Sequence, residues 1–436
     1  MGFLVVTLGE TELTSFFSLS NQYQESSPNN QANYLLSRTL RFLTPVTIGT
    51  LSWNGLSDRA TNFTYLILIF IAITLYVKFG NFFKLAYVFH LIVAIALSTF
   101  IAILMGPQKL SSLNDLGNQI FSSSQYIGEQ STIYNPLTDL IPAVKWIFAL
   151  ISLPYIVQIL KIRFPTILNN CVYAWIIGVL INTLTQLLQF LGIAKVNSGT
   201  FGFENFSGSR FPGLSSHPNA LAISVCLTLP LCFFPILKFT KLSKVILTLI
   251  FGASILITGS RAGIIVFIAA LLLIISRSQA TGKFRIYLAC ILVFFSLMII
   301  LSGFSDTLLA NTRLNSEDLS ARASNSARVS LLKFGWTSFT EYPVTGAGAA
   351  LIKVSHNIYL QILSSFGLIG FFTYCSFILR MLSNSARTSY LEKIPLLVFL
   401  MFGLLNNSLS DFYLYFPLGF AYVIKTKTFR FEKNRD

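Results

Sequence analysis

The chain has 436 residues, of which 54% are hydrophobic and 11% are charged, and its mean hydropathy is +0.68. These values exclude an ordinary soluble globular domain. The formal net charge of +15 does not indicate a nucleic-acid-binding protein, because the basic residues lie mostly in short clusters between apolar stretches, as in membrane proteins. We therefore predict an all-α polytopic membrane protein.

Twelve apolar stretches are candidates to cross a bilayer core about 30 Å thick. The first and last are the least regular, because they are short or interrupted by proline and polar residues. The predicted spans are 40–56, 62–77, 84–105, 141–160, 170–192, 218–237, 243–258, 261–276, 284–302, 357–379, 394–409 and 412–424. Twelve spans place both termini on the same side of the membrane.

The distribution of basic residues predicts which side that is. Most of the 31 lysines and arginines fall in short loops on one face, and alternate loops are basic, as the positive-inside rule requires. We therefore predict a cytoplasmic N-terminal segment (1–39), nine membrane helices (40–302), one large extracytoplasmic loop with short helices (303–356), three membrane helices (357–424) and a basic cytoplasmic tail (425–436).

Two arginines on the predicted outer face are not explained by topology. Arg210 lies in Ser-Arg-Phe-Pro-Gly, and Arg261 lies in Gly-Ser-Arg-Ala-Gly between two spans that leave almost no loop. An arginine at the centre of a membrane helix costs about 2.5 to 3.5 kcal/mol on insertion scales and less near the surface, so a functional role is expected. The alternative is that these side chains reach out to lipid phosphates.

The large loop contains one helical pattern. Apolar residues recur at spacings of three and four, namely Val329, Leu332, Trp336 and Phe339, and the pattern ends at Tyr342-Pro343. Such a helix would lie on the outer membrane surface with Trp336 at the interface. Arg328 lies in its first turn and is either a surface charge or a ligand, whereas Arg322 is predicted to be solvated.

His356 and Asn357 stand where the span 357–379 begins. The partial positive charge of a helix N-terminus disfavours imidazolium, so His356 is expected to be neutral and able to accept a proton. A helix-capping histidine is the alternative. His217, close in sequence to Arg210, is a minor candidate.

Several of these motifs occur in an order that resembles the O-antigen ligase and polymerase superfamily. They are Arg-Phe-Pro-Gly from Arg210, Ser-Arg-Ala-Gly around Arg261, Tyr-Pro-Val-Thr-Gly-Ala-Gly in the loop, and His-Asn-Ile-Tyr-Leu…Gly-Leu-Ile-Gly. The resemblance implies that His356 is the catalytic base and that Arg261, Arg328 and Arg210 hold the pyrophosphate of a polyprenyl-linked glycan. Asn357, beside the histidine, is grouped with the substrate-binding residues.

One departure from the family pattern is visible. The family often has an acidic residue just before Gly-Leu-Ile-Gly, where this chain has Ser365-Phe366. Whatever the acidic residue does in the family, this chain is not expected to do it with a carboxylate at that position.

The resemblance implies a glycosyltransferase in the bacterial plasma (inner) membrane, with an extracytoplasmic active face and a role in lipopolysaccharide or related cell-envelope biosynthesis. Its partners would be a polyprenyl-pyrophosphate-linked glycan donor and a lipid or glycan acceptor, and both the ligase and the polymerase reaction remain open. The sequence has no Asp-x-Asp pair and no carboxylate cluster on the outer face, so we expect no metal and no cofactor. Nucleic acid is not an expected partner.

The alternative is a transporter of an anionic or glycolipid substrate, with Arg261 and Arg210 at its binding site. The two spans that meet around Gly259-Ser260 look like the broken helix that transporters use. We find no second interrupted pair and no internal repeat to match it. A purely structural membrane subunit would leave the outward arginines unexplained.

Overall fold

The computed structural model describes residues 28–55, 58–79, 86–104, 136–193, 211–277, 319–348, 357–383, 389–406 and 411–421, together with positions 286, 289 and 290. The chain divides into a unit of residues 1–43 and a unit of residues 44–436. The features below belong to the second unit.

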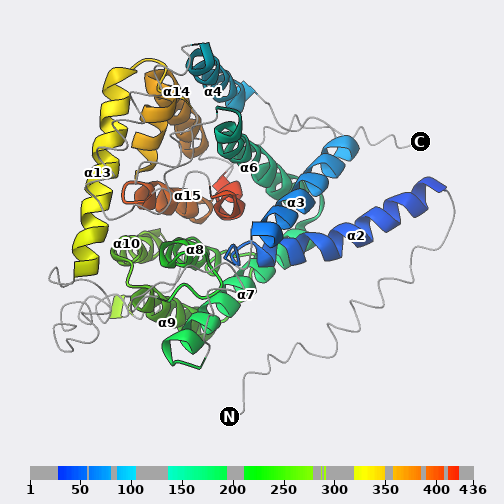
Figure 1. Cartoon of the computed structure of the whole chain (residues 1–436). Coiled ribbons are helices and arrows are strands. Elements are labelled where there is room, and N and C mark those ends of the chain that lie inside the picture. The colour runs from blue at the N-terminus through cyan, green and yellow to red at the C-terminus, as the bar shows by residue number, and fades with distance from the viewer. Residues whose placement is uncertain are drawn as a thin grey trace. The chain divides into compact units, whose positions relative to one another are not determined.

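Every regular element among these residues is a helix, as predicted (Figure 1). In chain order they are α2 (Pro28–Thr50, which crosses the unit boundary), α3 (Asp58–Phe79), α4 (Ala86–Leu104), α6 (Pro136–Arg163), α7 (Pro165–Phe190), α8 (Pro218–Leu231), α9 (Lys241–Thr258), α10 (Arg261–Arg277), α13 (Leu319–Glu341), α14 (Ile358–Ser383), α15 (Tyr390–Gly403), η3 (Phe412–Leu414), α16 (Tyr415–Leu418) and η4 (Gly419–Ala421).

Five helices of the described chain are long and apolar enough to cross a membrane. They are Asn62–Phe79, Ala143–Arg163, Pro165–Phe190, Lys241–Thr258 and Ile358–Leu382, and each overlaps a predicted span. Shorter apolar helices at Phe89–Ile101, Pro218–Leu231 and Arg261–Ser276 overlap three more. The protein is thus an all-α membrane protein in the part described, while the count of twelve spans and the sidedness stay predictions.

α8 forms the core of the 44–436 unit. All 14 of its residues are buried, and it packs against α7, α9, α10 and α15. A helix that is apolar on every side is surrounded either by protein or by lipid, and the burial of every residue shows that α8 is surrounded by protein. At a rise of about 1.5 Å per residue it is roughly 21 Å long, which is shorter than a bilayer core. α8 is therefore an internal support for its neighbours.

The two least regular predicted spans differ from continuous helices. α2 ends at Thr50, and the turn that follows is held by hydrogen bonds from Trp53 Nε1 to Gly178 O (2.9 Å) and from the Gly55 amide to Leu214 O (2.9 Å). Residues 412–421 form three successive short helical turns. Pro417 lies within them and lacks the N–H that a continuous helix would need.

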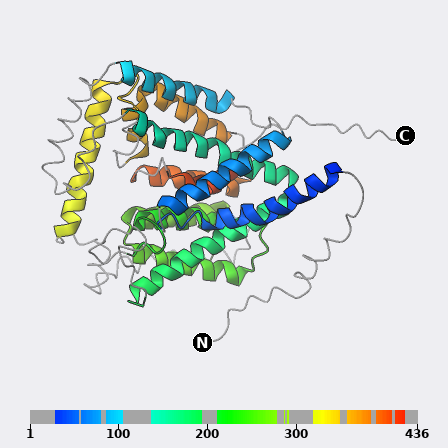
Figure 2. The ribbon, with the colours of Figure 1, turned by 45° about the vertical axis from the view of Figure 1, so that its right-hand side comes forward.

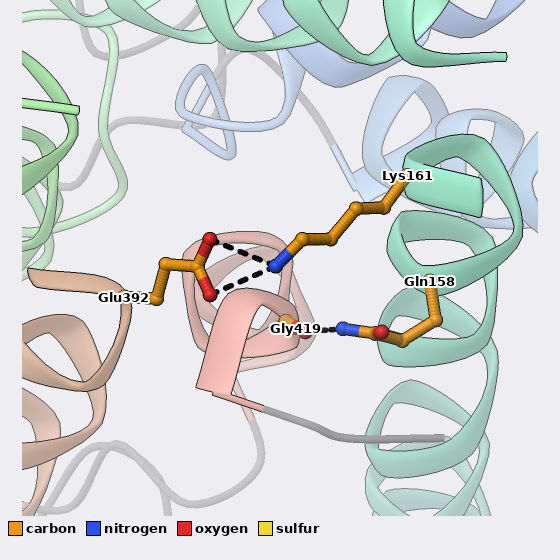
Figure 3. A network of polar contacts seen from close by, with 4 residues as sticks. All are labelled: Gln158, Lys161, Glu392 and Gly419. Carbon is orange, nitrogen blue, oxygen red and sulfur yellow. Dashed lines mark hydrogen bonds and ion pairs between the residues drawn. The ribbon is translucent and has the colours of Figure 1, made fainter. Parts of the chain in front are cut away.

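A polar cluster joins α6 to α15 and to η4 (Figure 3). Lys161 Nζ lies 2.8 Å from both carboxylate oxygens of Glu392. One turn earlier on α6, the buried Gln158 donates from Nε2 to Gly419 O at 2.9 Å. Lys161 lies in the last turn of α6 and Glu392 in the first turn of α15. We call these four residues the α6 cluster.

α13, the predicted helix of the large loop, runs across the direction of α8, α10 and α15 in both views (Figures 1 and 2). Its apolar stripe does not face the protein: Val329, Leu332 and Trp336 are exposed, whereas Phe334 and Ser338 are buried. Most of the stripe is thus exposed, and its contact with the outer membrane surface stays a prediction.

Candidate active site

Four helix ends meet at one end of the 44–436 unit. The C-terminal turns of α7 and α9 are joined by Gln186, whose amide bonds to Ser254. α8 begins at Pro218, directly after residues 211–217, and α10 begins at Arg261, directly after the turn that ends α9. The N-terminal ends of α8 and α10 therefore lie beside the C-terminal ends of α7 and α9. Helix N-termini carry partial positive charge, which favours an anionic ligand here.

Three amide side chains of α7 hold the segment 211–217 in place. Asn182, Gln186 and Gln189 are spaced by four and three residues, so they share one face of the helix, and all are buried. We call them the amide ladder. Gln189 exchanges two hydrogen bonds of 2.9 Å with the backbone N–H and C=O of Gly213. Gly213 has φ 63°, and a Cβ there would collide with Asn182, so the close approach requires glycine.

Asn182 ties the same segment to the turn after α2. Its Oδ1 accepts the N–H of Leu214 at 2.7 Å, and its Nδ2 donates to Ser52 O at 2.8 Å and Ser215 Oγ at 2.9 Å. Hydrogen bonds between membrane helices contribute only about 0.6 kcal/mol each on average. The ladder therefore acts mainly by fixing the position of segment 211–217, and it adds little to the free energy of unfolding.

Gln186, at the middle of the ladder, bonds to two different segments. Its Nε2 donates to Phe211 O at 3.1 Å and to Ser254 O at 3.2 Å, and its Oε1 accepts from Ser254 Oγ at 2.6 Å. Its side chain is completely buried. One side chain thus joins the start of segment 211–217 to α9.

His217 caps α8. Its Nδ1 accepts the N–H of Asn219 at 3.0 Å, and Pro218 occupies the first helical position, where a missing N–H has no cost. A ring whose Nδ1 accepts a hydrogen bond carries its proton on Nε2. His217, a minor candidate from sequence, therefore has a capping role at the same end of the unit as Arg261.

A carboxylate to which no sequence pattern pointed lies near this cap. The buried Tyr413 donates to Asp411 Oδ2 at 3.3 Å and is also hydrogen-bonded to Asn54. Asn54 Oδ1 in turn accepts the N–H of Ser216 at 3.2 Å, next to His217. The half-buried Asp411 is thus linked to the N-terminal end of α8.

Arg261 is the first residue of α10 and is half-buried. Ser260 Oγ caps this helix by accepting the N–H of Gly263 at 3.2 Å. A Cβ on Gly263 would lie 2.8 Å from Ala222 Cβ, so α10 packs closely on α8. Since α9 and α10 both pack on α8, the chain reverses at Gly259 (φ 59°) instead of continuing as one interrupted span.

α14 is broken at Gly367, where φ is 61° and ψ is −162°. The break leaves two N–H and two C=O groups without partners inside the helix, and residues 343–348, which follow α13, supply all four. The hydrogen bonds are Leu368 N to Pro343 O (2.8 Å), Ile369 N to Val344 O (3.3 Å), Ala347 N to Ser364 O (2.8 Å) and Gly348 N to Ser365 O (3.1 Å). Residues 343–348 therefore satisfy the backbone groups that the break in α14 exposes.

Two glycines make this contact possible. Gly346 has φ 72°, and a Cβ on Gly346 or on Gly367 would collide with the backbone of the other segment. Ser98 of α4 adds a hydrogen bond of 2.7 Å to Ser365 O. The Tyr-Pro-Val-Thr-Gly-Ala-Gly and Gly-Leu-Ile-Gly motifs thus pack directly on each other.

Asn357 uses its side chain within the protein. Its Oδ1 accepts the N–H of Leu360 at 3.0 Å, which caps α14, and its Nδ2 donates to Leu404 O at 2.9 Å, just after α15. Tyr359 OH donates to Leu400 O at 3.1 Å in the same region. These contacts fix the start of α14 against the end of α15.

Residues 246–375 match the family model described as O-antigen ligase. This segment is similar to the O-antigen ligase domain, and we use that name below for residues 246–375. The resemblance seen in the sequence is thereby confirmed. A search of curated proteins found no match. The O-antigen ligase domain covers most of α9, then α10, α13, residues 343–348 and the break in α14.

The O-antigen ligase domain contains most of the predicted site residues. Arg261 and Asn357 lie in it as described above, and Arg328 lies half-buried on α13. His356 is also within the matched segment but outside the described residues. Arg210 precedes the domain and is likewise outside the described residues, directly before Phe211.

The amide ladder and Asp411 lie outside the O-antigen ligase domain, and no sequence motif pointed to them. Three amides on one face of an apolar span were the available signal for the ladder. In the described part of the chain, no group of three or more His, Cys, Asp or Glu side chains is placed to hold a metal ion. The domain and the apolar helices support a membrane protein that transfers glycans in polysaccharide biosynthesis.

Proposed function

We propose that the protein moves a glycan from a polyprenyl pyrophosphate carrier onto an acceptor hydroxyl at the extracytoplasmic face of the bacterial plasma membrane. The observation that carries the proposal is the position of Arg261. It lies within the O-antigen ligase domain, at the end of the unit where α8 and α10 both begin. An arginine beside two helix N-termini suits the two phosphates of such a donor.

In the proposed reaction, His356 takes the proton of the acceptor hydroxyl as that oxygen attacks the anomeric carbon. The new C–O bond forms as the bond between sugar and pyrophosphate breaks, and the polyprenyl pyrophosphate leaves with one more negative charge. Direct attack inverts the anomeric configuration.

Arg261, Arg328 and Arg210 are proposed to hold the pyrophosphate and to stabilise the charge that develops on it. A guanidinium presents two parallel N–H donors that match phosphate oxygens, and it stays charged at any physiological pH. Asn357 is proposed to act from the start of α14, where its two hydrogen bonds fix the residue that follows His356 in sequence.

A transporter is the second candidate, and the break in α14 is the observation in its favour, because transporters coordinate substrates and ions at broken helices. Here the freed backbone groups are hydrogen-bonded to residues 343–348, so they are not available to a solute. The turn at Gly259 joins two antiparallel helices and is not a broken helix of that kind.

The test is a transfer assay with purified protein in detergent, a lipid-linked oligosaccharide donor and a lipid or glycan acceptor. Detergent removes the two sides of the membrane, so a transporter yields no product there. His356→Ala should lower kcat by roughly 10²- to 10⁴-fold, the usual contribution of a positioned base, while donor binding is kept. His90→Ala, a histidine on α4, is the matched control and should transfer normally. Normal turnover by His356→Ala would remove the catalytic assignment, and no transfer by the parent protein would favour the transporter.

A further inference from the structure

We propose that three lysines around the start of α9 bind the phosphate headgroup of an anionic phospholipid. They are Lys238, Lys241 and Lys244, and we call them the lysine cluster. Lys241 is the first residue of α9, and Lys244 lies three residues further on the same side of the helix. This site is independent of the proposed function, because Arg261 follows the other end of α9.

The length of α9 separates the lysine cluster from the candidate active site. At a rise of about 1.5 Å per residue, its 18 residues span roughly 27 Å, close to the thickness of a bilayer core. With Arg261 at one membrane surface, the cluster therefore lies at the other. The positive-inside pattern predicts that this second surface is the cytoplasmic one.

The helices around the lysine cluster supply no negative charge. α9 packs on α7, α8 and α10, and residues 164–193 and 211–277, which include all four helices, contain no aspartate or glutamate. Lys238 and Lys244 form no ion pair with any residue of the described ranges. By contrast, the half-buried Lys161 is paired with Glu392. The counter-charge of the cluster therefore comes from outside the protein.

The backbone that carries the cluster is fixed by contacts with α7 and η4. The ring of Phe234 packs edge-on against Phe420 of η4, with 5.1 Å between the ring centroids. The N–H of Lys238 donates to Tyr173 OH on α7 at 3.3 Å, and Phe239 packs edge-on against the same tyrosine. Membrane topology requires positive charge but no fixed geometry, so it does not explain this order.

An aromatic ring orients Lys244. Its Nζ lies 5.7 Å from the centroid of the Phe233 ring, within the range of a cation–π contact. Phe233 is buried and Lys244 is half-buried. Among the described residues, no oxygen accepts a hydrogen bond from this Nζ. The ring thus holds the ammonium in place and leaves its three N–H donors to an anion.

Exposed apolar side chains beside the cluster indicate that the anion belongs to a lipid. Leu242, Ile246, Leu249 and Ile250 are exposed and form one stripe on α9, which starts next to the lysines and runs towards the other end of the helix. Acyl chains that cover this stripe would bring the phosphate of the same lipid to the first turn of α9. A soluble phosphate would leave the stripe uncovered.

The experiment titrates the purified full-length protein, in a neutral detergent, with phosphatidylglycerol or with phosphatidylcholine, whose headgroup has a phosphate but no net charge. The measured quantity is the Kd of each lipid. Lys238→Gln/Lys244→Gln removes two charges and keeps long polar side chains. Lys78→Gln/Lys333→Gln is the matched control, because it removes the same charge from two exposed lysines outside the cluster. Lys78 also lies over a phenylalanine ring, that of Phe79, at 5.6 Å.

The parent protein should bind phosphatidylglycerol roughly 10-fold more tightly than phosphatidylcholine, or better. Lys238→Gln/Lys244→Gln should raise the Kd of phosphatidylglycerol by about 10- to 30-fold, since each basic residue at an anionic lipid surface contributes a factor of about five. The Kd of phosphatidylcholine should not change, and the control should keep both parent values. If the double variant does not insert, Lys244→Gln alone should raise the Kd of phosphatidylglycerol by about 5-fold.

Equal affinity of the parent protein for the two lipids overturns the inference, and so does a parent-like Kd of phosphatidylglycerol in Lys238→Gln/Lys244→Gln or Lys244→Gln. Glycerol phosphate, which carries the same charged group without acyl chains, should not displace the lipid. Displacement at a similar concentration would mean that the site takes soluble anions and that the assignment to a lipid is wrong. Glycan transfer is measured separately, so these results leave the proposed function untouched.

Discussion

The amide ladder and the α6 cluster both tie a helix to the backbone of another segment, but they differ in the charge of their side chains. Each contains a buried glutamine that donates to a backbone carbonyl, Gln189 to Gly213 and Gln158 to Gly419. The α6 cluster also contains a cation, and Glu392 neutralises it. The ladder contains neutral amides alone, which offer donors and acceptors without formal charge.

The difference shows how a protein can order irregular backbone beside a positive site. A carboxylate in the ladder could accept the N–H of Gly213 but could not donate to its C=O, and it would attract Arg261 and repel an anionic donor. Neutral amides fix the backbone and leave the charge of the arginine for the substrate.

The largest effect on donor binding is expected at the end with the ladder. Arg261→Lys keeps the charge but loses the planar pair of donors, so the KM for the donor should rise by about 10- to 100-fold while the protein still inserts into the membrane. Steady-state kinetics with the lipid-linked donor measure this. Arg322→Ala is the control. Because Arg322 is predicted to be solvated, its replacement should leave the KM for the donor nearly unchanged. A parent-like KM for Arg261→Lys would count against a bidentate contact.

A second prediction concerns the break in α14, which is held by backbone groups and not by side-chain amides. Gly367→Ala forces alanine into a left-handed conformation and pushes its Cβ into the 343–348 segment, so it should destabilise the protein by about 2 to 4 kcal/mol. Gly192→Ala is the matched control, because Gly192 also has a positive φ of 72° but nothing lies within 4 Å of the added Cβ. It should cost about 1 kcal/mol. Thermal unfolding in detergent measures both, and equal losses would mean that the contact with 343–348 is unimportant.

The smallest effect is expected at the α6 cluster. Glu392→Gln removes an ion pair whose side chains are 33% and 18% exposed, and pairs near a surface contribute about 0.2 to 1 kcal/mol. The melting temperature should fall slightly, and both kcat and KM for the donor should stay unchanged. A clear loss of transfer would show that the two ends of the bundle are coupled.

Hydropathy was sufficient to predict the helical membrane class, because a long apolar run such as 170–192 has few alternatives to a spanning helix. It was less successful at 412–421, where Pro417 interrupts a run that is apolar throughout. The motif order around Arg261 and Gly367 was sufficient to predict the O-antigen ligase resemblance.

Other features depended on tertiary contacts that sequence spacing does not encode. Gly367 sits in an apolar run that looks like an ordinary span, and its break is stable only because residues 343–348 complete it. Gln186 looks like any polar residue in a membrane helix until its partners Phe211 and Ser254 are known. A one-dimensional pattern indicates which face of a helix is polar, but not which segments meet there.

The completed break in α14 has a consequence for how the protein is made. A helix with four open backbone groups is costly to leave in lipid, since each unsatisfied group costs several kcal/mol there. The segment that satisfies them, residues 343–348, precedes α14 in the chain, and Ser98 precedes it by far more. Synthesis runs from the N-terminus, so every partner of the break has left the ribosome by the time α14 reaches the translocon. The order of the chain therefore allows the break in α14 to be completed as soon as α14 is inserted, before α15 and residues 412–421 follow.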